Sequence, residues 1–545
     1  MKFQIKENLI DKAISYFSPG LGMKRRQARL GLQATSKGGY FGGSKTRRGV
    51  SGWNPFGGDA DTDHQLDFEG LRNRSRDLAR NDCTAGSAIN TTCTNVVGPG
   101  LTPFPTIDRR ALNLTMEQAT EWERDTKRKF FVWANSVNCS ADKTQSFWDI
   151  QEMSFRSFLE SGDVFCHLPM AKRTKFWPFR LVLNVIESDR VCNPPGQQDT
   201  KDLIKGVRKI GGVPVRYVVA DAHPGNRLYI KDKAKFKEIK IVGSKTGRRN
   251  IIHLMKKLRP GQTRGIPFLA PVIELLKQLS RYTEAEVMAA VISGYFTVFV
   301  KSESGGTDIA TTLTEDETGQ SDGDNDMALG QGTIVGLAED ESIDTANPGR
   351  PNAGFEQFVL AITRQIGAQL EIPFEILTKH FKSSYSAARA ALLEAWKCWK
   401  TKRAWFARGF CQPIYEAWLD DMISSGQIVA PGYFDDIHTQ AAWARAKWVG
   451  PAKGMINEKQ ELEAVKMRLE MNLSTGEQET IETTGGDYES NVEQRAKERK
   501  LLAKSGLIGG QGGEGPPQDP KQTPEEPEDL DKNDLEEGKE NNEIN

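Results

Sequence analysis

The sequence GIPFLAPVIELLKQLSRYTEAEVMAAVIS, residues 265–293, decides how the chain is organised. Two prolines punctuate its start, and apolar residues then recur three or four positions apart, from Val272 and Leu276 to Leu279. That spacing predicts an amphipathic helix. A helix of about 25 residues would be roughly 38 Å long, since each residue adds 1.5 Å.

A second long helix is predicted further along the chain. Phe355, Phe358 and Ile362 repeat at the same spacing, and Pro373 ends the pattern because proline cannot continue a helix. Between the two helices, residues 302–332 are rich in Gly, Thr, Asp and Glu and nearly free of apolar residues. Strand-like pieces flank this acidic loop at 295–301 and 333–338. The two helices are therefore expected to bracket a small excursion that contains β-structure.

The residues before this pair of helices, 65–260, predict an α+β region. Their hydrophobic pattern has the period of a helix in three early segments and then changes to short β-branched or aromatic runs between Gly, Pro and Asp. The expected helices are 67–95, 119–133 and 148–159, and the expected strands are 163–169, 180–186, 213–220 and 227–230. The predicted fold class is α+β.

A short link, FEILTKHFKSS (374–384), separates the second long helix from a third. The third helix, at 387–424, contains Pro413, and a kink is expected there because proline removes a backbone hydrogen bond. Trp396, Trp399 and Phe406 lie on one side of it. Their helical spacing favours packing in a core over a surface on which nucleic-acid bases stack.

The charge of the chain is balanced overall but not locally. The 73 basic residues equal the 73 acidic ones, yet residues 1–60 hold 11 basic against 3 acidic residues, and residues 506–545 hold 3 against 12. Residues 1–64 are predicted to be a basic flexible arm that either contacts nucleic acid or an acidic partner, or is a solvated tail. Residues 425–505 are polar and mostly helical, and 506–545 predict a disordered acidic tail.

The cysteines and histidines indicate no disulfide framework and no metal centre. The seven cysteines include no C-x-x-C pair, and the six histidines are scattered. Buried free thiols in a reducing compartment are therefore expected, with no metal and no cofactor. The longest apolar run, 287–300, is shorter than the ~20 residues that span a bilayer. The expectation is a soluble protein with no membrane partner.

No catalytic motif stands above background, so the sequence predicts a protein that is not an enzyme. GGYFGGSKT (38–46) and VGSKTG (242–247) only faintly resemble phosphate loops, because neither places Gly-Lys-Ser/Thr in order. No G-x-S-x-G stands with a suitable His/Asp set. Many carboxylates fall in the acidic loop and the acidic tail, where they are expected to be solvated.

Five segments, in order along the chain, resemble the portal proteins of lambda-like tailed bacteriophages, and the resemblance spans about residues 65–500. They are LRNRSRDLARND (71–82), VVGPGLTP (96–103), HLMKKLRPGQTRGIPFLAP (253–271), SSYSAARAALLEAW (383–396) and GPAKGMINEKQELEAVKMRLEMNLST (450–475).

The resemblance implies a homo-oligomeric ring, typically of twelve subunits, at one capsid vertex of the virion, assembled in the host cytoplasm. Terminase pumps double-stranded DNA in through such a ring, and the DNA later leaves by the same route. The implied partners are further copies of the chain, double-stranded DNA, the terminase large subunit, a head–tail adaptor, and the major capsid and scaffold proteins. Such rings also nucleate head assembly.

The resemblance also implies a portal fold with named parts. The expected parts are a basic arm at 1–64, an α+β wing at 65–260, stem helices at 261–295 and 351–373, a clip at 296–350 with its acidic loop at 302–332, a tunnel loop at 374–386, a kinked wing helix at 387–424, a helical crown at 425–505 and a disordered tail at 506–545.

Within the expected tunnel loop, Lys379 and Lys382 are the candidate DNA-contact residues. B-DNA carries one negative charge per about 1.7 Å, so a continuous basic lining would hold it, whereas a few mobile lysines would let it slide. The alternatives left open are a DNA-binding capsid adaptor or scaffold protein that forms no ring, and a nucleic-acid enzyme.

Overall fold

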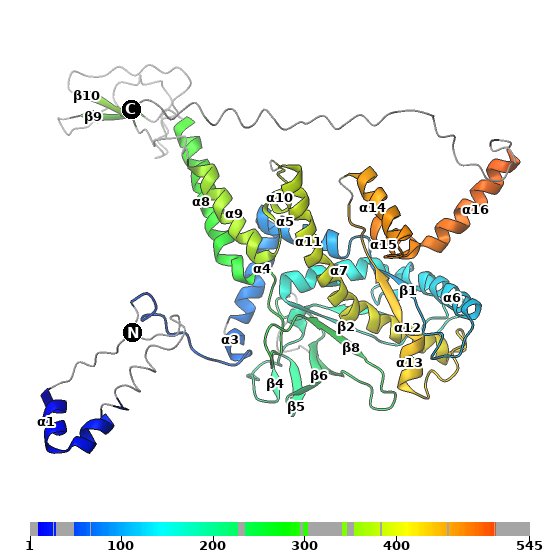
Figure 1. Cartoon of the computed structure of the whole chain (residues 1–545), viewed down its shortest axis with the longest axis horizontal. Helices are drawn as coiled ribbons and strands as arrows, with labels where there is room; N and C mark the ends of the chain where they lie inside the picture. The colour runs from blue at the N-terminus through cyan, green and yellow to red at the C-terminus, as the bar shows by residue number, and fades with distance from the viewer. Residues whose placement is uncertain are drawn as a thin grey trace, which may run out of the picture. The chain divides into compact units, whose positions relative to one another are not determined.

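The computed structural model describes residues 9–25, 27–28, 48–65, 67–226, 235–294, 298–302, 341–345, 354–381, 384–454, 457–505 and 507. The chain divides into two compact units, Met1–Pro451 and Ala452–Asn545 (Figure 1). In the described residues, no helix is both long enough and apolar enough to cross a membrane. The expected strands at 227–230 and 333–338 lie outside the described residues, as does most of the acidic loop.

The first unit mixes helices with short strands, as the α+β prediction requires. Its helices are α1 (Leu9–Phe17), α3 (Thr62–Gln65), α4 (Phe68–Asn81), α5 (Cys83–Val96), α6 (Met116–Ala134), α7 (Phe147–Ser161), α8 (Ile273–Gly294), α9 (Phe355–Leu370), α10 (Phe374–Thr378), α11 (Tyr385–Phe406), α12 (Gln412–Ser424) and α13 (Ile437–Trp443). Its strands are β1 (Thr102–Pro105), β2 (Asp163–His167), β3 (Asn184–Ile186), β4 (Leu203–Ile204), β5 (Val207–Ile210), β6 (Val213–Ala220), β7 (Phe236–Lys240), β8 (Ile251–Met255), β9 (Val298–Ser302), β10 (Glu341–Thr345) and β11 (Ala446–Val449).

The helix predicted over 67–95 is two helices, α4 and α5, and the prediction of one continuous helix is wrong. Asp82 separates them with extended backbone angles, φ −107° and ψ 123°. Its side chain accepts a hydrogen bond from the Ala85 N–H at 2.7 Å and so caps α5. Asp82 also accepts from Ser280 Oγ of α8 at 2.6 Å, so the break connects the early helices to the long one.

Two sheets follow the early helices. In the first, β2 lies between β3 and β8 and runs antiparallel to both, with Phe165 opposite Ile186 on one side and His253 on the other. In the second, β4, β5, β6 and β7 form an antiparallel meander. Two small pairs complete the strands: β9 with β10, and β1 with β11. The second of these joins residues more than 300 positions apart, which no local pattern indicated.

One continuous core joins α5, α6, α7, β2, α8, α9, α11 and α12. Its centre is aromatic: the Phe130 ring meets Phe147, Tyr415 and Trp418 edge-to-face at centroid distances of 5.1–5.7 Å. Trp399 and Phe406 are fully buried. The interpretation of the Trp396, Trp399 and Phe406 set as packing is therefore confirmed for these two residues.

All seven cysteines are free, and four of them, Cys93, Cys139, Cys166 and Cys411, are buried. The expectation of buried free thiols holds for these four, whereas Cys83 is exposed and Cys192 and Cys398 are half-buried. Burial raises the pKa of the Cys93, Cys139 and Cys166 thiols to about 12, which makes them poor nucleophiles.

The third long helix is interrupted near Pro413, as expected, but by a π-helical segment and not by a simple proline kink. A π-helical segment, Ala407–Cys411, joins α11 to α12, and Pro413 lies in the first turn of α12. Proline has no N–H to donate to the carbonyl four residues earlier, and the looser π turn absorbs that loss. Phe406 and Phe410 stack across the segment, 5.2 Å apart and 13° from parallel.

The two long helices predicted from the sequence are α8 and α9, and they lie side by side (Figure 1). Tyr282 of α8 stacks on Phe355 and meets Phe358 edge-to-face, at 5.6 and 4.8 Å. Leu276 and Ile366 face the core and are fully buried. Val287 and Met288, near the far end of α8, are more than half exposed.

The C-terminal region predicted as one piece, 425–505, is divided by the structure. Residues 425–451, with α13 and β11, belong to the first unit, and the second unit contains α14 (Glu458–Glu470), α15 (Gly476–Thr484) and α16 (Tyr488–Lys504). In the described part of the second unit, Glu479 is the one buried residue, and it pairs with Arg468 at 2.7 Å. These helices therefore build no apolar core of their own within the described residues.

Candidate functional site

The predicted DNA-contact loop, 374–386, begins with the short helix α10 (Phe374–Thr378). Lys379 is the C-cap of this short helix, and its backbone adopts the left-handed conformation, φ 55° and ψ 33°. Its N–H and that of His380 both donate to the Glu375 carbonyl, so the turn is hydrogen-bonded while the side chains of Lys379, His380 and Phe381 are exposed. Lys382 lies outside the described residues, so its position relative to Lys379 is not described.

A buried contact holds α10 against the core. Leu377 is buried, and its carbonyl accepts a hydrogen bond from Ser87 Oγ of α5 at 2.7 Å. Pro373 precedes the helix, and its carbonyl accepts from the Leu377 N–H at 2.9 Å. The base of the loop is therefore fixed, whereas its tip, from Lys379 onward, is exposed.

A three-residue contact, which we call the elbow, lies where α9 turns into α10. Its members are Glu371, Cys398 and Lys402. Glu371 Oε2 accepts from Lys402 Nζ at 2.9 Å and from Cys398 Sγ at 2.9 Å, and Lys402 Nζ also lies 2.8 Å from Cys398 Sγ. The hydrogen bonds from the Cys398 thiol and from Lys402 lower the pKa of Glu371, while burial and the Glu371 carboxylate raise the pKa of the Cys398 thiol.

A second ionic group, which we call the buried joint, lies where the sheet region meets the segment that leads into α8. Its centre is the ion pair between Asp163 of β2 and Arg264, with Arg264 Nε 2.6 Å from Asp163 Oδ2. Asp163 is completely buried. Its carboxylate also forms hydrogen bonds with His253 Nε2 at 3.1 Å and with the Gly265 N–H at 3.1 Å. Ser188 Oγ donates to it as well.

Arg264 uses its remaining donors on the backbone. It reaches the carbonyls of Val191 at 2.7 Å, Lys205 at 2.6 Å and Ser188 at 2.9 Å, and its guanidinium lies about 5 Å from the ring of Phe68. No buried side-chain N or O atom of Asp163, Arg264 or His253 thus lacks a hydrogen-bond partner, which is the condition for a buried ion pair to be tolerated.

The titration of the buried joint follows from this geometry. Burial opposes ionisation of Asp163, but the Arg264 charge and the His253 hydrogen bond hold the pKa of that carboxyl far below its usual range. Burial lowers the pKa of His253, against the opposing effect of Asp163. The joint therefore holds a carboxylate, a guanidinium and a neutral imidazole at neutral pH.

Two glycines let the backbone close over the joint. A Cβ on Gly265 would lie 1.9 Å from the Gly162 carbonyl oxygen, and Gly162 itself has φ +87°. No side chain fits at Gly265 without moving backbone. The segment 264–266 is thus pressed directly against the end of α7 and the start of β2.

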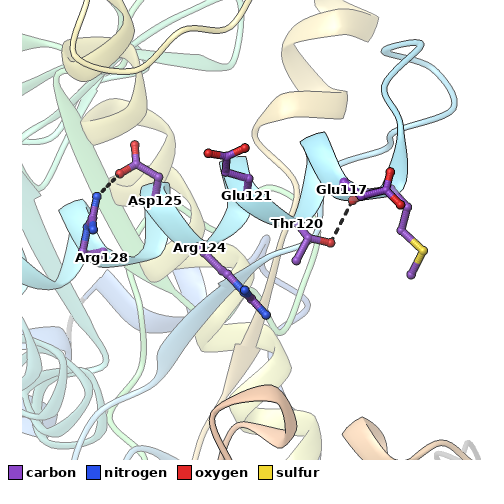
Figure 2. A pocket seen from close by; sticks show the side chains of 7 residues that line it. Glu117, Thr120, Glu121, Arg124, Asp125 and Arg128 are labelled. Atoms are coloured by element: carbon purple, nitrogen blue, oxygen red, sulfur yellow. Dashed lines mark hydrogen bonds and ion pairs between the residues drawn. The ribbon is translucent and has the colours of Figure 1, made fainter. Parts of the chain in front are cut away.

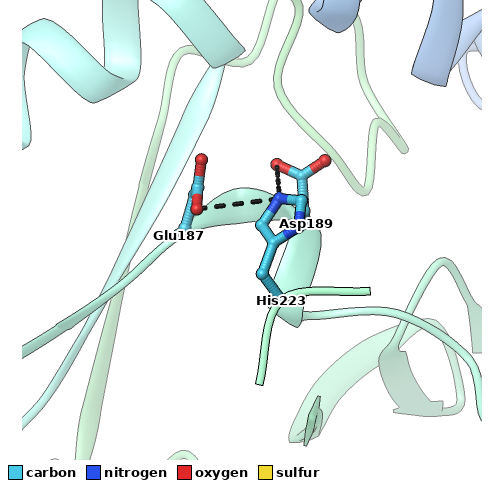
Figure 3. Close-up of side chains that lie close together, drawn as sticks. All are labelled: Glu187, Asp189 and His223. Atoms are coloured by element: carbon cyan, nitrogen blue, oxygen red, sulfur yellow. Dashed lines mark ion pairs between the residues drawn. The ribbon is translucent and has the colours of Figure 1, made fainter. Parts of the chain in front are cut away.

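Glu187, Asp189 and His223 form the one group of possible metal ligands found among the described residues, and Figure 3 shows the histidine ring between the two carboxylates. His223 Nε2 lies 3.7 Å from each carboxylate. Arg72 pairs with Asp189 at 2.8 Å, and Arg76 pairs with both acids. Because the two arginines already neutralise the carboxylates, we assign this group to an ion-pair network and to no metal site.

Two of the hollows on the described surface bear on the candidate site. One, of about 810 Å³, lies along α6, where Glu117, Glu121 and Asp125 follow one another at helical spacing and Arg128 pairs with Asp125 (Figure 2). All of its lining residues come from one helix, so it brings no groups from different elements together. The other, of about 660 Å³, lies beside the elbow and is lined by α9, α10 and α11.

Sequence reasoning identified the loop but missed the contacts that support it. Asp163 and Arg264 lie 101 positions apart in the sequence, and Glu371 and Lys402 lie 31 positions apart. The Arg-Gly dipeptide at 264–265, within a segment punctuated by Gly and Pro, is the one signal that could have drawn attention to the joint.

Most of the chain aligns with known proteins. The family model "Phage portal protein, lambda family" matches residues 46–403. The portal protein of Escherichia phage N15 is 24% identical over 496 residues, which cover 86% of this chain and 90% of that protein. Portal protein B of Escherichia phage lambda is 23% identical over 494 residues, covering 86% and 91%.

Solved structures were compared as well. The chain overlaps a chain from the neck of an empty GTA particle with a TM-score of 0.40 and 12% identity, over 80% of this chain and 98% of the other, which is too weak to identify a fold by itself. The assignment rests on the sequence matches, since the family model spans well over half of the residues. The chain belongs to the lambda family of phage portal proteins.

Proposed function

We propose that copies of this chain close into a ring at one capsid vertex of the virion, through which double-stranded DNA is packaged by terminase and later ejected. The observation that carries the proposal is the match of the lambda portal family to residues 46–403. The relatives named as portal proteins align over about nine-tenths of their own length, so the likeness is not confined to one part.

The long helices support a ring because they leave apolar surface uncovered within one subunit. On α8, Val287, Met288 and Val291 are about half exposed, and so is Phe358 on α9. Isolated helices with exposed apolar faces need neighbours, and a repeating head-to-tail contact that closes covers every copy equally. A neighbouring subunit is the occupant that the ring supplies.

We propose the following correspondence between the parts of the portal fold and the residues of this chain. The wing would be 65–260 together with the helix at 387–424, the stem would be 261–295 and 351–373, and the clip would be 296–350. The tunnel loop would be 374–386, and the crown would come from 425–505, of which the separate second unit supplies 452–505. The arm at 1–64 and the tail at 506–545 would flank these parts.

In this proposal Lys379 and Lys382 approach DNA phosphates in the channel. The exposed position of Lys379 at the loop tip supports this role, because a lysine on a mobile stem attracts phosphate without bidentate capture. Terminase, the head–tail adaptor, and the capsid and scaffold proteins would bind other surfaces of the ring. The chain would act as a structural channel, with no reaction of its own.

The ring is tested by negative-stain imaging and native mass spectrometry of the purified full-length chain. Closed rings with a central opening are expected. Monomers or dimers, even with capsid proteins present, would contradict the ring and favour a DNA-binding capsid adaptor or scaffold protein that forms none.

The DNA contact is tested by the double variant Lys379→Ala/Lys382→Ala in phage. Altered packaging or genome retention is expected, with rings of normal symmetry. The matched control is Lys172→Ala/Lys175→Ala, which removes the same charge from exposed positions in the proposed wing. Rings that fail to assemble only in the loop variant would show that the two lysines are structural.

A further inference from the structure

Two residues with side chains adopt the left-handed backbone conformation at the two ends of the α9–α10 connection. Glu371 (φ 58°) ends α9, and Lys379 (φ 55°) ends α10. This conformation costs a residue other than glycine about 1–2 kcal/mol, so it persists where surrounding contacts hold it. The connection is therefore a bent segment with a strained residue at each end.

The two ends are held very differently. At Glu371 the carboxylate is bound by Lys402 and Cys398 of α11. At Lys379, no hydrogen bond or ion pair of the side chain is present within the described part of the chain. The first end is tied to α11 by its own side chain, whereas near the second end the tie runs through the Leu377 carbonyl, which accepts from Ser87 of α5.

The contacts around the elbow converge on one helix, α11. The Lys402 ammonium that binds Glu371 also lies 5.3 Å from the ring of Phe268, which belongs to the segment leading into α8. Next to Glu371, the Ile372 N–H donates to the Gly367 carbonyl at 2.9 Å, and a Cβ on Gly367 would come within 2.6 Å of the Ile372 carbonyl. The bend thus packs backbone on backbone, and Lys402 links the end of α9 to the segment that leads into α8.

Space is available beside the bend. The 660 Å³ hollow is lined on one side by Pro373 and Phe374 and on the other by Cys398 and Lys402. No side chain fills it in this conformation. If the Glu371 contacts were released, the bend between α9 and α10 would have space on this side, while Leu377 would still hold α10 against the core.

From these observations we propose that Glu371 is a positioning residue: by binding Lys402 and Cys398 it fixes the direction in which α10 leaves α9, and so holds the Lys379 loop in place as DNA passes. The proposal rests on the proposed channel function for its purpose. The contact of Glu371 with Lys402 and Cys398, which we call the tether, concerns the elbow alone, and it can be tested without DNA.

The elbow suits a positioning role better than a stabilising one. The Glu371 side chain is 61% exposed and that of Lys402 is 15% exposed. Ion pairs with an exposed partner contribute little to global stability. Losing the pair should therefore loosen the loop while the subunit stays folded, which separates this role from a structural one.

The test is hydrogen–deuterium exchange of assembled rings carrying Glu371→Gln. Amides of 372–381 are expected to exchange faster by about threefold, because a largely exposed ion pair contributes less than about 1 kcal/mol, while those of α12 stay unchanged, because only the local opening is made easier. The matched control is Glu394→Gln, which removes the same charge from the lining of the same hollow but touches Lys397 instead of the elbow.

The charge-swapped pair Glu371→Lys/Lys402→Glu should restore slow exchange, since it rebuilds the ion pair in reverse. Unchanged exchange in Glu371→Gln, or equal acceleration in Glu394→Gln, would overturn the tether. Faster exchange with normal DNA packaging and retention would support the tether and contradict the DNA role of the loop, so the two proposals fail separately.

Discussion

The buried joint and the elbow contain similar chemistry in opposite surroundings. In each, a carboxylate pairs with a cation from a distant element and receives a further hydrogen bond. Asp163 is completely buried and Arg264 is 4% exposed, whereas Glu371 is 61% exposed. Because the Asp163–Arg264 pair is buried, the fold depends on it. Because Glu371 is exposed, its pair with Lys402 can open. The comparison indicates which part of the subunit is rigid and which part can move.

The largest expected effect comes from breaking the buried joint with Arg264→Met. This leaves Asp163 without its counter-charge in the core, and removing one partner of a buried pair costs about 3–5 kcal/mol. Urea unfolding of the full-length chain measures the loss. The control is Arg208→Met, which breaks the half-exposed pair with Glu238 and should cost less than about 1 kcal/mol.

Adding Asp163→Asn to Arg264→Met should recover part of the lost stability, since the unpaired charge is then gone. If the double variant is less stable than Arg264→Met alone, the buried charge is not the cause of the loss.

A smaller loss is expected from Gly265→Ala, which tests the backbone contact that closes the joint. Its Cβ would overlap the Gly162 carbonyl, and overpacking of this kind costs about 1–3 kcal/mol. Thermal unfolding measures it. Gly70→Ala, in α4 with no atom within 4 Å of the new Cβ, should be neutral or stabilising by up to about 1 kcal/mol. Equal destabilisation by both would argue against close approach at the joint.

Acid should weaken the buried joint. The folded pKa of His253 lies below its unfolded value, so the unfolded chain binds a proton first as the pH falls below about 6.5. The folded pKa of Asp163 is also depressed, so its contribution is present above about pH 4 and is lost below it. Stability should therefore fall from pH 7 to pH 5, and less steeply in His253→Gln. An identical pH profile for His253→Gln would contradict this assignment.

The smallest expected change in stability is at the elbow. Glu371→Gln should lower the free energy of unfolding by less than about 1 kcal/mol, because the Glu371 side chain is largely solvated. Urea unfolding beside Arg264→Met measures the contrast directly. A loss as large as that of Arg264→Met would show that the elbow is part of the structural core and would remove the distinction between the two pairs.

The sequence predicted the parts whose information is local. The long helices α8 and α9 follow from apolar spacing, and so do α6 and α7; the capping boxes at which these two begin, Thr115 with Gln118 and Ser146 with Asp149, were not used in the prediction. The helix over 67–95 was predicted as one because its composition stays helical through Asp82, whose role as a cap depends on where the chain turns.

The supports of the candidate site could not be predicted, for the same physical reason that β1 and β11 were missed. Arg264 and Asp163 carry no periodic signal, and their pairing depends on how β2 and the segment before α8 meet in space. Glu371 lies just after a helix that the pattern did predict, but its partners are on α11. Lys379 could be proposed from the sequence because a lysine in a short link between helices is visible locally, and its DNA contact stays a prediction.

The π-helical segment between α11 and α12 has a consequence for evolution of the chain. A residue gained or lost inside an α-helix turns everything beyond it by about 100° around the axis. Deleting one position within Ala407–Cys411 would swing Tyr415 and Trp418 away from Phe130 and present polar side chains to the aromatic centre instead. The five-residue π-helical segment therefore fixes the angle at which α12 presents Tyr415 and Trp418 to Phe130, so the number of residues here matters as well as their identity.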